Sequence, residues 1–445
     1  MLCISEFNNV SLDWFKKIIS MTVFFKHLHL NTGLALFLVL LSSYNLRGQE
    51  LQDYKEYSGR ILNLNTDKPL EAASLLIKGT NISSISNTEG SFVLKVPETE
   101  MDNSIVISYL GYSSKEVPIA TLSTKKNKIL LAPKITYLSD VNLLSFKDPE
   151  ELVRAIFDKK ALNNPKKAFH MTAFYRETIK RRNRNVSLTE AVVNLHKQSY
   201  RGVKQDIVAL HKARKSTDYR RLDTIGFKLQ GGPFSTLFLD IMKYPNYIFT
   251  ASSIGNYTFS FEPPTAVNGK PVYVVSFAQR KDIREPLYKG VLYIEAESLA
   301  LTNADYSLNV ENKKEAANLF VERKPRDVKV LPVRANYRVN YRKKDGKWHY
   351  SYGSVALAFK VIRRGELFNS VYSLGAEMAV TNLEEEVQGS RREYQNPLKP
   401  TVILSDAISG FSDTDFWGAY NVIEPDKSIQ TAINKIQKEL RRIGS

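Results

Sequence analysis

The chain has 445 residues, and its 63 Lys and Arg against 46 Asp and Glu give a formal net charge of +17. This length allows two or three domains, and 43% hydrophobic with 24% charged residues is an ordinary globular composition, which excludes a largely disordered chain. The one cysteine, Cys3, lies in a segment that is expected to be removed. A disulfide scaffold, a cysteine-ligated zinc site and a thiol nucleophile are therefore excluded in the mature protein.

Residues 1–49 are predicted to be a signal peptide with an upstream extension. The apolar run Leu34–Leu41 is too short to span a bilayer but suits the hydrophobic region of a secretory signal. Glu6 and Asp13 do not suit the basic start of such a signal, so Met21 is expected to be the true start. A short amphipathic helix is the alternative. A signal peptide would direct export, so the protein is expected in the periplasm or on the periplasmic face of the outer membrane.

The basic charge belongs mostly to the mature chain. Residues 1–49 carry four Lys or Arg and two Asp or Glu, so the mature chain keeps a charge of about +15. Such a surplus attracts anionic surfaces, and for an exported protein these are phospholipid headgroups, lipopolysaccharide phosphates or acidic glycans rather than nucleic acid. The alternative is that the charge only maintains solubility.

Short alternating segments separated by turn residues follow the signal region, and this pattern is typical of an antiparallel sandwich. Gly79, Gly90 and Gly111 are expected at positions of positive φ or close backbone approach, and Phe92 and Tyr109 are expected in the core. The predicted strands are Ser58–Asn63, Ala73–Lys78, Ser91–Val96, Ser104–Tyr109 and Lys128–Leu131.

The same region carries an ordered series of motifs, which are Gly59–Ile61, Lys68–Ala73, Ile77–Thr80, Asn87–Phe92, Ile107–Tyr112 and Leu138–Val141. In order and spacing this series resembles the carboxypeptidase-regulatory-like domain. The resemblance implies a transthyretin-like sandwich of seven strands over residues 52–144. It also implies an accessory module of exported proteins and outer-membrane receptors, not a peptidase.

Residues 148–445 are predicted to form a large curved antiparallel sheet with a few helices, so the fold class of the whole chain is mainly β, of α+β type. Asp148-Pro149 is a helix start, Asn268-Gly269 and Asp345-Gly346 are hairpin turns, and Ser428 could cap an amphipathic C-terminal helix. A short helix is expected over Phe234–Lys243. The predicted strands are Met171–Ile179, Ser187–Tyr200, Asp206–His211, Tyr257–Phe261, Pro271–Phe277, Lys289–Glu295, Ala300–Asn309, Val328–Tyr341, Lys347–Lys360 and Ser370–Asn382.

The order Val272–Phe277, Gly290–Ile294 and Ser298–Ala300 is similar to the periplasmic lipoprotein-carrier fold. That resemblance implies an incomplete antiparallel barrel with helices across an apolar cavity. Asp415–Gly418 with Asn421–Pro425 resembles the tail of a group of exported bacterial proteins that pair the same sandwich with a region of this kind.

No motif for catalysis, for a cofactor or for a metal stands out. The mature chain has four His, and none is followed by Glu at zinc-site spacing. A hydrolase would need two carboxylates in one pocket, about 5–9 Å apart. The candidates for such a pair are Glu177, Glu190, Asp240 and Glu295.

The leading hypothesis is therefore a non-enzymatic exported protein that holds a lipid, an acyl chain or a protein segment on a concave apolar sheet. Its candidate wall residues are Val274, Leu292 and Ile294, and their parity along the strands decides which face they occupy. The alternatives are a scaffold or glycan-binding partner of an outer-membrane receptor, and a hydrolase.

Basic clusters at predicted hairpin ends are either an anion-binding rim, if they converge, or solubility residues, if they scatter. They are Arg181, Arg182, Arg184, Lys343, Lys344, Arg363 and Arg364.

Overall fold

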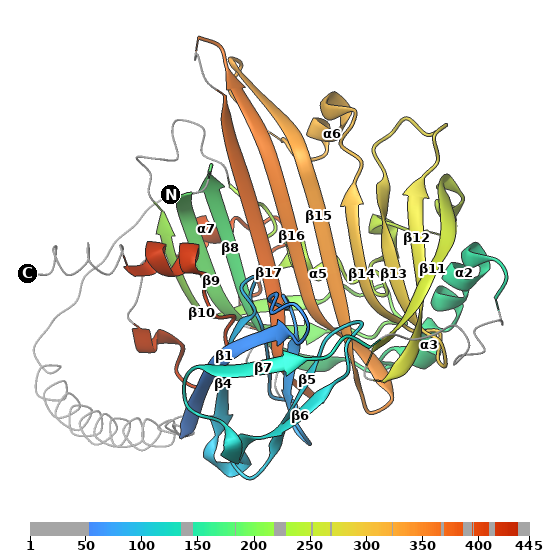
Figure 1. The fold of residues 1–445 in the computed structure, drawn as a ribbon. Helices are drawn as coiled ribbons and strands as arrows, with labels where there is room; N and C mark the ends of the chain where they lie inside the picture. Colours follow the sequence, from blue (N-terminus) through green and yellow to red (C-terminus); the bar gives the residue numbers. More distant parts are fainter. Residues whose placement is uncertain are drawn as a thin grey trace, which may run out of the picture. The chain divides into compact units, whose positions relative to one another are not determined.

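The computed structural model describes residues 53–134, 146–182, 184–217, 228–250, 252–267, 269–322, 324–365, 369–385, 394, 396–408 and 414–434. From Tyr54 onward these residues belong to one compact unit (Figure 1). The predicted signal region, Asn268 of the predicted Asn268-Gly269 turn and the part of the predicted C-terminal helix beyond residue 434 lie outside the described residues. No helix in the described part of the chain has the length and apolar character needed to cross a bilayer.

The first seven strands form two small sheets, with orders β4-β1-β7 and β3-β2-β5-β6. The predicted seven-stranded sandwich is confirmed, and the sequence had missed only the two shortest edge strands, β3 and β6. The strands are β1 (Tyr54–Asn63), β2 (Ser74–Ile77), β3 (Ser83–Ile85), β4 (Ser91–Pro97), β5 (Ser104–Ser108), β6 (Lys115–Pro118) and β7 (Asn127–Leu131).

The core of the sandwich and its turns follow the sequence closely. Phe92 is fully buried, whereas Tyr109 lies half-buried at the edge of the core. Gly79, Gly90 and Gly111 all have positive φ, as expected. At Gly90 a Cβ would lie 2.5 Å from the carbonyl oxygen of Ile61, so only glycine fits there.

The remaining ten strands form a single antiparallel sheet of order β10-β9-β8-β17-β16-β15-β14-β13-β12-β11. All ten were predicted. They make two meanders, β8–β10 and β11–β17, which are joined because β17 pairs with β8. The strands are β8 (Phe169–Arg181), β9 (Arg184–Lys197), β10 (Ile207–Thr217), β11 (Tyr257–Val267), β12 (Lys270–Gln279), β13 (Tyr288–Glu295), β14 (Leu301–Leu308), β15 (Val328–Lys344), β16 (Lys347–Arg363) and β17 (Ser370–Glu385).

The helices are short. The α-helices are α2 (Pro149–Asp158), α3 (Lys160–Asn163), α5 (Phe234–Leu237), α6 (Lys313–Asn318) and α7 (Leu404–Ala407). The 3₁₀ turns are η1 (Glu98–Glu100), η2 (Ile119–Thr121), η4 (Pro245–Tyr247), η5 (Ile254–Asn256) and η7 (Thr414–Trp417).

Two local predictions are confirmed and one is corrected. Asp148 caps α2 by accepting the N–H of Glu150 at 2.8 Å, and Asp345 and Gly346 both have positive φ in the β15–β16 turn. The C-terminal helix begins earlier than predicted, at residue 427, and its cap is Asp426, which accepts the N–H of Ile429 at 2.8 Å. Ser428 instead donates to the Asp426 carboxylate at 2.6 Å.

The two faces of the large sheet carry different layers, because successive side chains along a strand alternate between faces. On the face that we call the helix-covered face, Tyr175 and Leu237 of α5 belong to one large apolar core. On the opposite face, the sandwich face, Phe174 packs with Ile85 of the sandwich and Trp417 of the C-terminal segment. The sandwich is also hydrogen-bonded to the sheet, since the Ser83 hydroxyl donates to the Val380 carbonyl at 3.0 Å.

Candidate functional site

The three predicted wall residues do not share a face. Leu292 is paired with Val275 and Ile294 with Tyr273, and all four belong to the core of the helix-covered face. Val274 is paired with Tyr293 and therefore points to the sandwich face. Near β12 and β13 the helix-covered face is filled by the protein's own side chains, because Phe249 stacks edge-on against Phe277 with ring centroids 5.0 Å apart.

An open cavity remains on the helix-covered face farther along the sheet, over β15, β16 and β17. We call it the apolar pocket, and its volume is about 730 Å³. Its floor consists of buried side chains of these three strands, and α6 contacts β15 beside it. The apolar lining residues are Leu229, Leu319, Phe320, Val321, Pro325, Val330, Val355, Leu357, Phe359, Leu374 and Ile403.

The solvent side of the apolar pocket is polar. Lys228, Glu322 and Lys324 also line it, and all three are exposed. The ammonium of Lys228 is 2.7 Å from a carboxylate oxygen of Asp406, while that of Lys324 donates to the Val328 carbonyl at 2.8 Å. The pocket therefore combines an apolar floor with a charged mouth, the arrangement of a site for an amphiphile.

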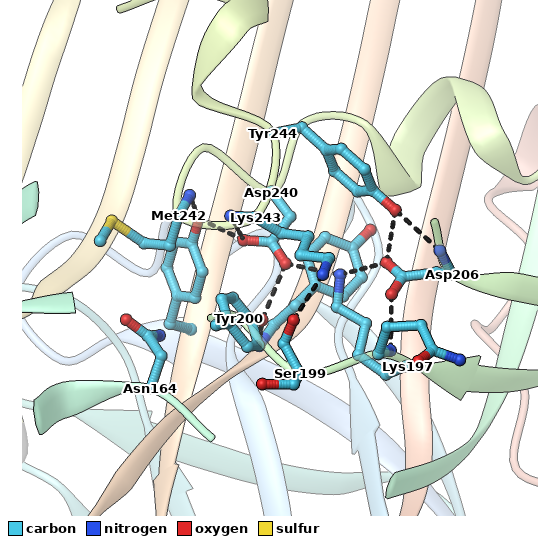
Figure 2. A network of polar contacts seen from close by, with 12 residues as sticks. Asn164, Lys197, Ser199, Tyr200, Asp206, Asp240, Met242, Lys243 and Tyr244 are labelled. Carbon is cyan, nitrogen blue, oxygen red and sulfur yellow. Dashed lines mark hydrogen bonds and ion pairs between the residues drawn. The ribbon is translucent and has the colours of Figure 1, made fainter. Parts of the chain in front are cut away.

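A buried polar network lies under the same face, at the end of β9 (Figure 2). The ammonium of Lys197 is fully buried between two carboxylates, 2.6 Å from Asp206 and 2.7 Å from Asp240. Burial opposes its charge, but the two carboxylates more than offset this and raise the pKa of Lys197. The network thus holds a buried cation in its charged form.

Tyrosine hydroxyls complete the network. Tyr200 donates to Asp240 and Tyr244 donates to Asp206, each at 2.7 Å. Tyr341 of β15 donates to the second oxygen of Asp240 at 3.0 Å. Burial together with the charge of Asp240 holds the pKa of Tyr200 well above its ordinary value. Every carboxylate oxygen of Asp206 and Asp240 therefore has a hydrogen-bond donor, and these contacts connect β9 with β15 and with the segments that hold the two aspartates.

The four carboxylates considered for a hydrolase are held apart or neutralised. Glu190 lies between Arg176 at 2.8 Å and Arg214 at 2.7 Å, Asp240 pairs with Lys197, and Glu295 pairs with Lys343 at 3.2 Å. None of the four lines the apolar pocket. No group of three or more His, Cys, Asp or Glu within the described ranges could hold a metal ion.

Glu177 differs from the other three carboxylates. It is 4% exposed and accepts a hydrogen bond from the Tyr175 hydroxyl at 3.0 Å. Burial raises its pKa to about 7, although the hydrogen bond from Tyr175 acts in the opposite direction. Register pairs Glu190 with Arg176, the neighbour of Glu177, so Glu177 and Glu190 point to opposite faces and cannot act on one substrate atom.

The predicted basic rim is divided between two ends of the sheet. Tyr372 pairs with Arg181, and Val328 pairs with Arg363, so Arg181, Arg182, Arg184, Arg363 and Arg364 lie at one end. Lys343 and Lys344 lie at the other end of the 17-residue strand β15, about 50 Å away. The clusters belong to hairpins that point in opposite directions, so the seven residues do not form a single rim.

Sequence reasoning missed the apolar pocket and the buried network. The pocket floor comes from alternate residues of three strands, Val355 and Leu357 among them. The sequence shows this alternation within each strand, but it does not show which strands lie side by side. The network depends on Lys197, a residue type that is rarely fully buried, and no local signal distinguishes it from a surface lysine.

Comparison with known proteins supports the first domain directly. Residues 57–143 match the model of the CarboxypepD_reg-like domain family. The predicted carboxypeptidase-regulatory-like resemblance is therefore confirmed over the sandwich. No curated protein matches the chain.

Solved structures similar to the chain have low sequence identity. A putative outer membrane lipoprotein-sorting protein domain from Vibrio parahaemolyticus is 11% identical, with a TM-score of 0.25, and covers 56% of this chain and 96% of its own. A LolA superfamily protein from Nitrosomonas europaea is 10% identical, with a TM-score of 0.22 and coverage of 55% and 97%. A DUF1329 family protein from Desulfovibrio piger is 14% identical, with a TM-score of 0.25 and coverage of 56% and 98%. The predicted weak similarity to the lipoprotein-carrier fold is found among these matches.

Proposed function

We propose that this chain is a non-enzymatic protein of the bacterial cell envelope that binds the apolar chain of a lipid in the apolar pocket. The protein acts in the periplasm or on the periplasmic face of the outer membrane, and the sandwich serves as an accessory interaction module. The observation that carries the proposal is a cavity of about 730 Å³ with a floor of Val330, Leu357 and Leu374. Its volume lies within the range of about 300–1,000 Å³ typical of small-molecule sites.

The energetics of such a site follow from burial of the hydrocarbon. Each methylene group that leaves water gains about 0.8 kcal/mol, so a chain of several methylene groups binds without a specific polar contact. A charged headgroup would remain at the mouth, beside the exposed side chains of Lys228, Glu322 and Lys324. Polar groups at the mouth would orient such a ligand.

The test is binding of a fluorescent fatty acid, 11-(dansylamino)undecanoic acid, to the purified protein. Leu374→Trp introduces a larger side chain into the floor of the pocket, and we expect at least tenfold weaker binding. Val371→Trp is the matched control, because Val371 lies on the same strand but is 42% exposed. This control should bind the probe as the native protein does.

Two further measurements complete the experiment. Circular dichroism and the melting temperature establish that Leu374→Trp is folded, and lipid extraction with mass spectrometry detects an amphiphile carried through purification. The proposal is wrong if the native protein neither binds the probe nor carries an extractable amphiphile. Equal binding by both Trp variants would also overturn it.

A further inference from the structure

A second cavity lies on the opposite side of the large sheet, between the sandwich and strands β11–β17. We call it the sandwich-face pocket, and its volume is about 440 Å³. Ser83 and Tyr109 contribute to it from the sandwich, while Tyr293 and Asn340 contribute from the sheet. No residue of the apolar pocket lines it, so the two cavities are separate sites.

The wall of the sandwich-face pocket is rich in hydroxyl, amide and aromatic groups. Polar hydrogen-bonding side chains and flat rings on one concave surface suit a small ligand with several polar groups rather than an acyl chain. These lining residues are Ser74, Ser83, Ser84, Ser108, Tyr109, Thr265, Tyr293, Asn303, Asn340, Ser351 and Tyr352.

One of the two arginines in this wall is already neutralised. The Nε of Arg338 lies 2.5 Å from a carboxylate oxygen of Asp305, and both residues line the pocket. Burial opposes the charge of Arg338, but Asp305 more than offsets this and raises its pKa. Arg338 therefore has its counter-charge within the protein.

Arg342 has no such counter-charge. Its guanidinium makes no hydrogen bond or ion pair with any residue in the described part of the chain. Burial lowers the pKa of Arg342 to about 10, and no carboxylate among the residues that the structure describes offsets that effect. An arginine held partly out of water without an anion is costly, unless an anion from outside completes the site.

The neighbouring side chains of His349 and Trp348 supply no counter-charge to Arg342. His349, its partner across β15 and β16, is buried, and this burial together with the charges of Arg342 and Lys344 lowers the pKa of His349 to about 3. His349 is therefore neutral at physiological pH and supplies neither a counter-charge nor a second cation. Trp348, which also lines the pocket, has an indole N–H with no acceptor among the described residues.

We infer that the sandwich-face pocket binds a small polar ligand through a carboxylate or phosphate group, which pairs with the guanidinium of Arg342. A planar guanidinium suits either anion, because it can donate two parallel hydrogen bonds to a pair of oxygens. The hydroxyl and amide groups of Asn303, Asn340 and Ser351 then bind the uncharged part of the ligand.

The experiment is isothermal titration calorimetry at fixed ionic strength with three probes, namely inorganic phosphate, D-glucuronate and neutral D-glucose. We expect at least one anion to bind more tightly than glucose. Binding of phosphate alone would identify a phosphate-bearing ligand, and binding of glucuronate alone would identify a carboxylate-bearing one. If neither anion binds, or if glucose binds as tightly, the proposal fails.

Two substitutions assign the binding to Arg342. Arg342→Gln should weaken anion binding at least tenfold, while Arg342→Lys, which keeps the charge but not the planar fork, should bind with intermediate affinity. Arg334→Gln is the control, because Arg334 lies on the same strand, is exposed and does not line this pocket. Equal losses in Arg342→Gln and Arg334→Gln would overturn the proposal.

The stability of the ligand-free protein gives an independent measurement. If the ligand-free protein has no anion beside Arg342, Arg342→Gln removes an unpaired, partly buried charge, and the melting temperature should rise or stay unchanged. A clear fall would show that Arg342 already pairs within the protein, and that outcome contradicts the proposal. Addition of the bound anion should raise the melting temperature of the native protein but not that of Arg342→Gln.

Discussion

Glu177 is a buried carboxyl group whose charge is not stabilised by a nearby cation among the described residues. Its hydrogen-bond donor is the neutral Tyr175 hydroxyl, in contrast to Glu190, which lies between two arginines. Burial raises the pKa of Glu177 from 4.5 to about 7, so the folded protein favours its protonated form. The unfolded chain ionises at lower pH, and this difference links stability to pH.

The prediction from Glu177 is a loss of stability as the pH rises from about 4.5 to about 7. In this window the folded state binds more protons than the unfolded state, so the free energy of unfolding falls with pH by a total of roughly 3 kcal/mol from this one residue. Glu177→Gln should remove that contribution. Urea unfolding of both proteins at pH 5 and pH 8 measures it, and an unchanged difference between the two pH values in Glu177→Gln would contradict the prediction.

At the residue scale, the sequence predicted which side chains are apolar or basic, but it did not predict which face of the sheet or which charged partners they have. Val274, Leu292 and Ile294 were predicted as walls of one apolar cavity, with their faces left to strand parity. The pairing of β12 with β13 places Val274 on the face opposite to Leu292 and Ile294. Arg342 was likewise one basic residue among many. Its significance lies in the missing counter-charge, which depends on strands distant in sequence.

At the scale of elements, the buried network ties the end of β9 to three other parts of the chain. Lys197 ends β9, Asp206 precedes β10, and Asp240 follows α5. The hydroxyl of Tyr341 links Asp240 to β15. The network therefore fixes the loop between β9 and β10 and the turn after α5 on the same face of the sheet.

We predict that Lys197→Met destabilises the protein by about 3–5 kcal/mol, because it leaves two buried carboxylates without a cation. Urea unfolding at neutral pH measures the change. The triple variant Lys197→Met, Asp206→Asn, Asp240→Asn should recover part of the loss, since it removes the unpaired charges.

Lys228→Met is the control for this prediction. Lys228 pairs with Asp406 at 2.7 Å, but both side chains are 50% exposed, so the change should cost less than about 1 kcal/mol. A similar loss of unfolding free energy in Lys197→Met and Lys228→Met would contradict the prediction that the buried ion pairs of Lys197 matter more than an exposed one.

The strands of both sheets were predictable because their signals are local. Alternating polarity identified all ten strands of the large sheet, and Asp345-Gly346 identified the β15–β16 turn because both residues tolerate positive φ. The two missed strands, β3 and β6, have three and four residues, too few for a periodic pattern. Strand order was not predictable, since pairing of β17 with β8 joins residues about 200 positions apart.

At the scale of the whole molecule, the C-terminal segment joins the sandwich and the large sheet. The side chain of Asn421 pairs with the backbone of Lys95 in β4, accepting its N–H at 2.7 Å and donating to its carbonyl at 3.3 Å. Trp417 stacks edge-on against Phe174 of the sheet with ring centroids 5.3 Å apart. The side-chain amide of Asn421 thus satisfies the backbone N–H and carbonyl of Lys95 on the free edge of β4, as a neighbouring strand would.

We predict that Asn421→Asp loosens this segment. The carboxylate would face the Lys95 carbonyl with no hydrogen to donate, at a site that is 5% exposed, which should cost about 1–3 kcal/mol. Limited tryptic digestion with mass spectrometry should show faster cleavage after Lys427. Asn434→Asp is the matched control, because Asn434 is exposed and its side chain accepts a hydrogen bond from Gln430 of the same helix. Equal cleavage rates in the two variants would contradict the role of Asn421.

The position of β17 in the sheet also constrains the order of assembly. Until residues 370–385 have been synthesised, β8 and β16 each present a long unpaired edge, of 13 and 17 residues, to other molecules. Any product that stops before Ser370 would keep both edges open and would be prone to self-association. Because β17 covers both of these edges, a nascent chain stays prone to aggregation until residues 370–385 have been made and have paired with β8 and β16.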